Sequence, residues 1–244
     1  MNTEFHLNPI IQYLAVAVWA ISGTIVGQDR GFDIVGVFAI ALITSTGGGI
    51  LRDGLFLQDT PWVISDPVAL PLIVTAVLIA MLLTPFMRRI RPHLDQAVAY
   101  LDAAGVPAFA IVGLSMALAQ GIPLSGAIFI GLISGVGGGL IRDLLVSEIP
   151  ALFRPGQYFT LIALLCLLIY LALVYSGVLS ANGSATAAIG IAFILRALVI
   201  RFNWRTLPAD AMTAQITHSI GRFTPLRYRP NKATGSPPET KIDN

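Results

Sequence analysis

The sequence predicts an all-α integral membrane protein with seven transmembrane helices, and three observations carry this prediction. Of the 244 residues, 55% are apolar and only 11% are charged, whereas about 25% of the residues of a soluble domain are charged. The mean hydropathy is +0.79. Seven apolar runs, each near the roughly 20 residues that cross a bilayer, leave only short loops and one tail. A soluble protein is therefore disfavoured.

The seven spans are separated by polar, Pro and Gly residues. The fourth span is short for a crossing unless residues 97–101 extend it through Gly105 and Pro107. No Lys or Arg precedes the first span and no good small-residue cleavage site follows it, so we expect it to stay in the protein rather than act as a cleaved signal peptide. The spans are expected near residues 10–26, 34–57, 68–86, 106–119, 124–146, 158–175 and 185–200.

The basic residues predict the orientation in the membrane. Seven spans place the two termini on opposite sides, and 14 of the 15 Lys and Arg residues then fall on the C-terminal side, with Arg52 alone on the other. Basic loops face the cytoplasm, so we expect a multi-pass protein of the cell inner membrane with its N-terminus outside. Residues 1–206 are expected to form the membrane domain. Residues 207–244, polar and rich in Pro, are expected to be a mobile cytoplasmic tail.

An internal repeat relates residues 21–55 to residues 111–145 by an offset of 90. Its strongest block reads GGGILRDGL in the first copy and GGGLIRDLL in the second. Each copy holds three spans, and an odd number of spans reverses direction, so the copies must be inverted relative to each other. We expect inverted repeats near residues 10–90 and 97–177, with a seventh helix at 185–201 outside them.

The glycine triplets are expected to break the second and fifth helices. Each Gly costs a helix interior about 0.8–1 kcal/mol relative to Ala, and the carbonyls that a break frees are tolerated in a membrane only where they are buried or line a wet cavity. Hydroxyl groups precede both triplets. Carbonyl and hydroxyl oxygens suit a partly dehydrated cation. The predicted ion pathway therefore includes Thr44, Ser45, Thr46, Gly47, Gly48 and Gly49 in one copy and Ser134, Gly137, Gly138 and Gly139 in the other.

Close helix packing is the alternative interpretation of the glycines. Gly131, Gly135 and Gly139 are spaced by four residues, which is the pattern of small residues at an ordinary tight helix contact.

Four charged residues lie nearest to the hydrocarbon: Arg52, Asp53, Arg142 and Asp143. An ionised side chain at mid-membrane costs at least about 2.5–3.5 kcal/mol, so we expect them to face protein or water along the pathway, with each Asp compensated by its Arg. The alternative is a pair that reaches the interface and only anchors a helix end. Even in a pore the Arg must be neutralised or must move, because an exposed Arg repels cations.

Other functional classes find less support. Arg88, Arg89 and Arg91 are candidates for contact with lipid head groups, although topology explains this cluster equally well. The net charge of +2 is too small to favour a nucleic-acid partner.

Metal sites, cofactors and enzyme motifs find no support either. The three histidines are too dispersed for a metal site, and no cofactor is expected. The single Cys166 is expected in the core. No H-E-x-x-H, P-loop or G-x-S-x-G motif is present, so the chain is not expected to be an enzyme.

The two GGGxxRD blocks, the inverted three-helix halves and the seventh helix together resemble the prokaryotic branch of the trimeric intracellular cation (TRIC) channels. The resemblance covers roughly residues 10–201. It implies a homotrimer with a pore in each subunit, permeation of monovalent cations that favours potassium, and second and fifth helices kinked at Gly47–Gly49 and Gly137–Gly139. Animal members carry a lysine at one glycine site and bind phosphoinositide there. Neither triplet here has a Lys, so that regulation does not transfer.

The leading functional hypothesis is a passive channel for the monovalent cations potassium and sodium, with potassium favoured. A secondary transporter of a small solute such as glycine is the alternative, because inverted repeats and broken helices also build alternating-access carriers. A structural or lipid-binding protein is a third class. The sequence does not separate the first two.

Overall fold

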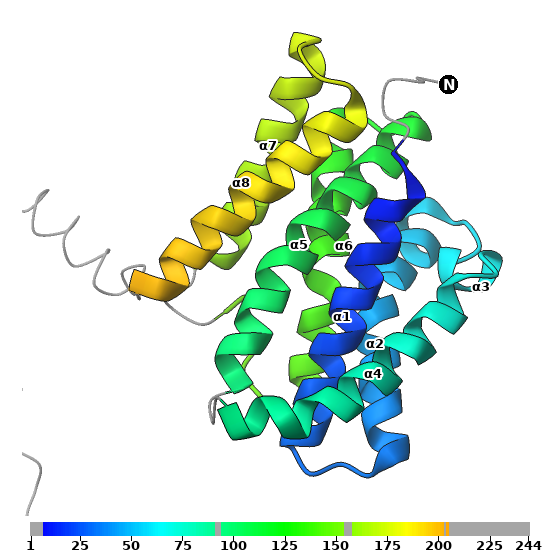
Figure 1. Cartoon of the computed structure of the whole chain (residues 1–244). Helices are drawn as coiled ribbons and strands as arrows, with labels where there is room; N and C mark the ends of the chain where they lie inside the picture. The colour runs from blue at the N-terminus through cyan, green and yellow to red at the C-terminus, as the bar shows by residue number, and fades with distance from the viewer. Residues whose placement is uncertain (1–6, 91–93, 154–157, 203, 205–244) are drawn as a thin grey trace, which may run out of the picture. The chain divides into compact units, whose positions relative to one another are not determined.

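Every regular element in the described part of the chain is a helix (Figure 1). The computed structural model describes residues 7–90, 94–153, 158–202 and 204, and for residues 87–90 it describes the backbone alone. Within these ranges seven spans are long and apolar enough to cross a membrane, so the prediction of an all-α protein with seven spans is confirmed. The predicted tail, residues 207–244, lies outside the described residues. The elements are α1 (Pro9–Asp29), α2 (Ile34–Ile50), the π-helix η2 (Leu51–Leu57), α3 (Trp62–Ser65), α4 (Ala69–Ile90), α5 (Leu94–Ala119), α6 (Leu124–Leu145), α7 (Phe159–Ser176) and α8 (Ala181–Phe202).

The helices begin and end where local chemistry satisfies their backbone. The side chain of Asn8 accepts a hydrogen bond from the amide of Ile10, and the side chain of Asp33 accepts one from the amide of Gly36, which are N-caps of the usual kind. The turns after α1 and α5 use Gly31 and Gly121, whose φ angles are +72° and +78°. These two glycines are 90 residues apart, so the repeat is present in the backbone as well as in the sequence.

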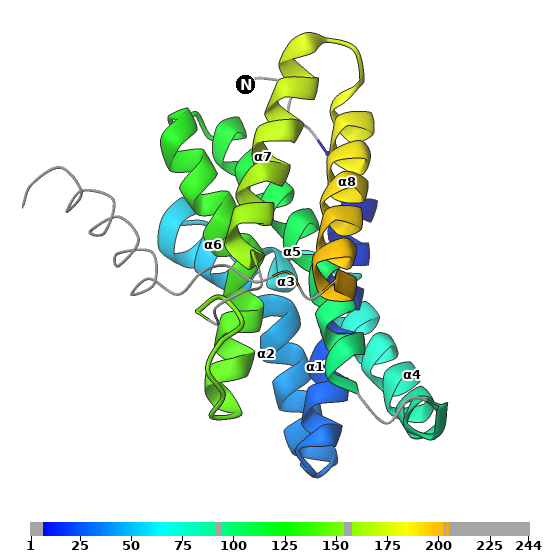
Figure 2. The same ribbon diagram turned by 90° about the vertical axis from the view of Figure 1, so that its left-hand side faces the viewer.

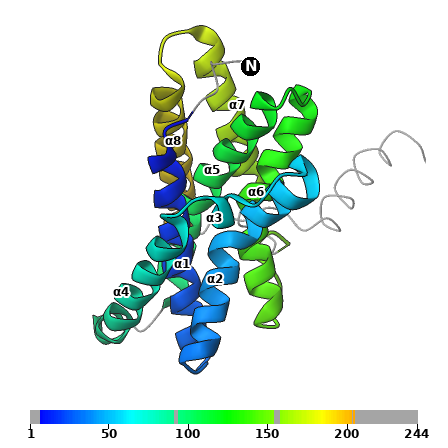
Figure 3. The ribbon, with the colours of Figure 1, turned by 90° about the vertical axis from the view of Figure 1, so that its right-hand side faces the viewer.

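The two copies of the repeat run in opposite directions (Figure 1). α1 descends where α5 ascends, and the same opposition holds for α2 and α6 and for α4 and α7. Within the first copy, α1 packs against α2 and α4. Within the second, α5 packs against α6 and α7. The copies meet through α1 with α5 and through α2 with α6, while α8 lies against α5 and α7 (Figures 2 and 3).

The fourth span is long enough for a full crossing. α5 extends over 26 residues from Leu94, which is the extension that the sequence left open, and Pro107 lies inside the helix without ending it. From Asp102 onward most residues of α5 are buried, because this helix packs against α1, α6, α7 and α8.

The expected breaks at the glycine triplets are wrong. α2 stays α-helical through Gly47–Gly49 and changes to a π-helix only at Leu51, after the triplet. α6 passes through Gly137–Gly139 without interruption. The physical reason is that both triplets lie at a helix crossing that brings two backbones together, so the absence of side chains serves packing rather than helix opening.

Candidate functional site

The site is built around the crossing of α2 and α6, which Figures 2 and 3 show side by side. A Cβ atom added at Gly48 would overlap the backbone oxygen of Ser134, and one added at Gly138 would overlap the backbone oxygen of Thr44. The two contacts are related by the same offset of 90 residues. The pseudo-twofold axis of the repeat therefore passes through this crossing.

The hydroxyl groups predicted for the pathway are buried, and most are bound to their own helix. Thr44 donates to the carbonyl of Ile40, and Ser45 and Thr46 both donate to the carbonyl of Leu42. The hydroxyl of Ser134 has no hydrogen-bond partner among the described residues. In this conformation, therefore, three of the four hydroxyl protons point at helix carbonyls.

Arg142 lies at the centre of a buried polar cluster. Its Nε donates to Asp143 at 2.9 Å, and its Nη1 and Nη2 each donate to one carboxylate oxygen of Asp102 at 2.9 Å. Nη1 also donates to the hydroxyl of Ser22 at 2.7 Å. The ring centroid of Trp19 lies 5.6 Å from the guanidinium carbon, within the range of a cation–π contact. Every nitrogen of this buried guanidinium group thus has an acceptor.

Arg52 has a simpler environment. It is fully buried, and its Nε and Nη2 donate to Asp53 at 2.5 and 3.0 Å. Its Nη1 has no hydrogen-bond partner among the described residues. Asp53 also accepts from the amide of Trp62, just as Asp143 accepts from the amide of Ala151. Both predicted Arg–Asp pairs are therefore formed, and both are buried rather than exposed at a helix end.

Sequence reasoning missed Asp102 and its neighbours Ser22 and Trp19. Asp102 lies in the residues that extend the fourth span, and an acidic residue inside an apolar stretch is a signal for a buried partner. The residue 90 positions earlier is Gln12, so the repeat itself marks position 102 as a place where the two copies differ in charge.

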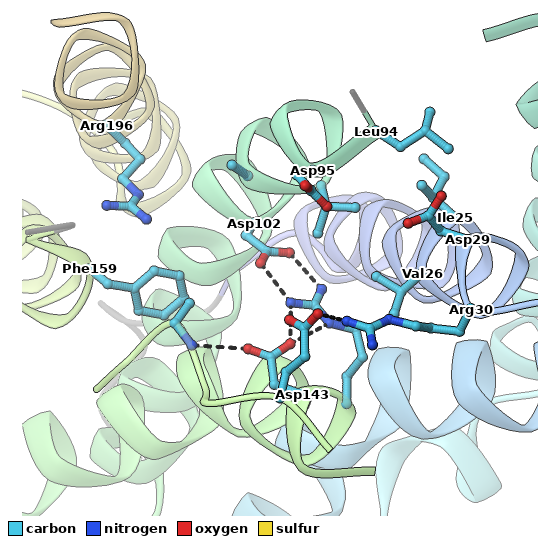
Figure 4. A pocket seen from close by; sticks show the side chains of 15 residues that line it. Ile25, Val26, Asp29, Arg30, Leu94, Asp95, Asp102, Asp143, Phe159 and Arg196 are labelled. Carbon is cyan, nitrogen blue, oxygen red and sulfur yellow. Dashed lines mark hydrogen bonds and ion pairs between the residues drawn. The ribbon is translucent and has the colours of Figure 1, made fainter. Parts of the chain in front are cut away.

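A cavity of about 210 Å³ borders the Arg142 cluster (Figure 4). Asp102 and Asp143 lie in its wall, and Arg196 of α8 lies beside Phe159, with its guanidinium carbon 5.0 Å from the ring centroid. Arg30 and Glu148, which also line the cavity, form an ion pair between the two copies of the repeat. The cavity wall carries five carboxylates, Asp29, Asp95, Asp102, Asp143 and Glu148, against three guanidinium groups, Arg30, Arg142 and Arg196.

A second cavity, of about 230 Å³, lies at the other end of α1 and includes Asn8, Gln12 and Asp66 in its wall. Tyr13 donates a hydrogen bond of 2.7 Å to Asp66, which lowers the pKa of that carboxyl group. Gln12 also lines a much smaller space beside Arg52. No described residue lines both of the larger cavities, so the two are separate in this conformation.

The predicted lipid contacts stay predictions. Arg88 and Arg89 belong to the last turns of α4 by their backbone, and Arg91 lies outside the described residues.

Residues 9–89 and 99–175 match one family model, which is described as a glycine transporter. The chain belongs to this family. Its two matched segments correspond to the two copies of the repeat. A curated family relative, the UPF0126 inner membrane protein YadS of Escherichia coli strain K12, is 34% identical over 151 residues, which are 62% of this chain and 71% of the relative. Seven spans and such relatives agree with a multi-pass inner membrane protein.

Solved structures connect the family to the TRIC channels. The crystal structure of a prokaryotic TRIC channel in 0.5 M KCl is 30% identical, with a TM-score of 0.69 over 80% of this chain and 95% of that chain. A structure described as the structural basis for conductance through TRIC cation channels is also 30% identical, with a TM-score of 0.66 over 83% of this chain and 97% of that one. The resemblance to the prokaryotic TRIC family that the motifs indicated is therefore confirmed.

Proposed function

We propose that the protein is a passive channel for monovalent cations that favours potassium, with one pathway in each subunit of a homotrimer. The observation that carries this proposal is the cavity beside Arg142, whose wall holds two more carboxylates than guanidinium groups. A cleft whose low-dielectric wall carries a net negative charge concentrates cations. The likeness to solved TRIC cation channels supports the same function.

The proposed pathway joins the two larger cavities past the α2–α6 crossing. The length of α1, which reaches from one cavity to the other, is about 30 Å at 1.5 Å per residue, close to the thickness of the hydrocarbon. The pathway runs past the buried pairs of Arg52 with Asp53 and Arg142 with Asp143. Because the glycines pack backbone against backbone, conduction requires α2 and α6 to separate at Gly48 and Gly138. The described conformation corresponds to a closed pathway.

Planar bilayer recording of the purified protein under a potassium chloride gradient tests the proposal. We expect discrete currents that reverse near the potassium equilibrium potential, with a smaller reversal potential after sodium replaces potassium. Currents that reverse near the chloride potential, or protein that is silent at all voltages in every preparation, would contradict a cation channel.

Transport of glycine is the second candidate function, and the description of the matching family model favours it. Uptake of labelled glycine into proteoliposomes separates the two. A carrier gives saturable uptake without unitary currents, whereas a channel gives unitary currents and no saturable glycine uptake.

The assembly and orientation are part of the same proposal. The resemblance to the TRIC family supports a homotrimer, which mass determination in detergent tests. The distribution of basic residues supports an outside N-terminus and a cytoplasmic C-terminus. Reporter fusions at the C-terminus test this orientation. If a fused reporter that works only in the periplasm were active, the C-terminus would lie outside and the proposed orientation would be wrong.

A further inference from the structure

We infer that Asp102 determines charge selectivity and makes the two halves of the pathway electrically unequal. The inference rests on the proposed cation conduction. It starts from a comparison of the two copies of the repeat, which place matching groups around their arginines at positions 90 residues apart but differ at one charged position.

The two arginine sites match except at two positions, Asp102 and Ser22, and only the first changes the charge; Ser22, which accepts from Arg142, corresponds to Val112. Arg142 corresponds to Arg52, Asp143 to Asp53 and Trp19 to Phe109. The match is structural as well, because a Cβ at Gly139 would contact Trp19 while one at Gly49 would lie 3.9 Å from Phe109. Asp102, however, corresponds to Gln12. Arg142 is thus held by two carboxylates, and Arg52 by one.

This difference leaves the sites with different charges. The pair of Arg52 and Asp53 is neutral, whereas the three residues Arg142, Asp102 and Asp143 carry one excess negative charge. This charge also interacts electrostatically with Arg196 of α8, which lies outside the repeat. On the neutral side, the Nη1 of Arg52 and the Nε2 of Gln12 have no hydrogen-bond partner among the described residues, and both side chains line the same small space. A carboxylate at position 12 would therefore meet a donor that is already in place.

Asp102 is placed to act on ions. It is 4% exposed and lies in the wall of the 210 Å³ cavity, on the helix that packs against both α1 and α6. A charge in a buried wall is screened less than one at the surface. Neutralising Asp102 would halve the excess of two negative charges in that wall. The charge of Asp102 lies toward one end of the pathway, so it raises the local cation concentration at that end only. This asymmetry should make the current rectify at low salt.

The first variant is Asp102→Asn, which keeps the size of the side chain and an acceptor for Arg142. We expect the permeability ratio of potassium to chloride to fall several-fold and rectification at low salt to decrease. Asp95→Asn is the matched control, because Asp95 lines the same cavity on the same helix but is exposed. It removes the same formal charge and should change selectivity less.

The second variant moves the charge between the copies. Gln12→Asp combined with Asp102→Asn should restore selectivity and reverse the direction of rectification. Should Asp102→Asn fail to assemble, Gln12→Asp alone keeps the inference testable, because an added negative charge in the half that holds Arg52 should reduce rectification. The role of Asp102 would be overturned if the wild type conducts cations and these variants keep its selectivity and rectification. A wild-type protein that conducts no ions would instead overturn the proposed function itself.

Discussion

Gly48 and Gly138 lie against each other's helices at the point where α2 crosses α6. A Cβ at Gly48 would lie 3.4 Å from the backbone nitrogen of Gly138, and closer still to the oxygen of Ser134. Backbone atoms cannot move aside as a flexible side chain can, so this crossing admits no residue larger than Gly without displacing a helix.

We therefore expect Gly48→Ala and Gly138→Ala to destabilise the protein. Overpacking of this kind costs about 1–3 kcal/mol, and each kcal/mol lowers the melting temperature by about 2–4 °C in a chain of this length. Thermal unfolding of the detergent-purified variants measures the loss. Gly190→Ala is the matched control, since nothing lies within 4 Å of its Cβ position. An equal effect at Gly190 and Gly48 would contradict the role of the crossing.

The two arginines are expected to differ in their contribution to stability. Arg142→Gln leaves two buried carboxylates, Asp102 and Asp143, without their cation, whereas Arg52→Gln leaves only Asp53. Removing one partner of a buried pair costs about 3–5 kcal/mol, and we expect the larger loss at Arg142.

Thermal unfolding of both arginine variants measures this difference. Adding Asp102→Asn to Arg142→Gln should recover part of the stability, because it removes one of the unpaired charges. Equal losses at the two arginines, or no recovery in the double variant, would show that Asp102 is not a partner of Arg142 in the folded protein.

The sequence was sufficient for the spans, the inverted repeat and the two Arg–Asp pairs, because hydropathy, segment length and an offset of 90 residues determine them. It was insufficient for the glycine triplets. The propensity of Gly to weaken a helix predicted a break, but the packing of α2 on α6 supplies contacts that keep both helices intact. A local propensity gives no information about such a tertiary contact.

The partner of Arg142 was also beyond the sequence. Asp102 is 40 residues away on another helix, and no local pattern joins the two. The repeat offered an indirect signal, because Gln12 stands where the second copy has Asp102, but only the packing of α5 against α6 shows which cation the carboxylate meets.

Asp66 is expected to make stability depend on pH in the acid range. The hydrogen bond from Tyr13 is the main cause that lowers the pKa of Asp66 in the folded protein. Its stabilising effect is therefore present above the ordinary Asp pKa of about 3.9 and is lost as the pH falls through the lower folded value. Tyr13→Phe should raise that folded pKa, so the wild type should retain stability to a lower pH than the variant.

Melting temperatures measured from neutral to acid pH check this expectation. The wild type and Tyr13→Phe should differ near neutral pH and converge in acid. Asp66→Asn is the control, since in that background Tyr13→Phe should leave the pH dependence unchanged. Curves that stay parallel over the whole range would contradict the link between Tyr13 and Asp66.

Glu148 and Arg30 allow a test of how the charges in the cavity wall act on ions. The two residues form an ion pair in that wall, and their charges are opposite. Their side chains are 35% and 37% exposed, so the pair should add little to stability, and both charges should act mainly on ions in the cavity. Glu148→Gln should lower the single-channel cation conductance at low salt, and Arg30→Gln should raise it. Both effects should vanish near 1 M salt, where the screening length falls to about 3 Å. Conductance that falls in both variants would show that the ion pair acts through its geometry, since a purely electrostatic role requires opposite signs.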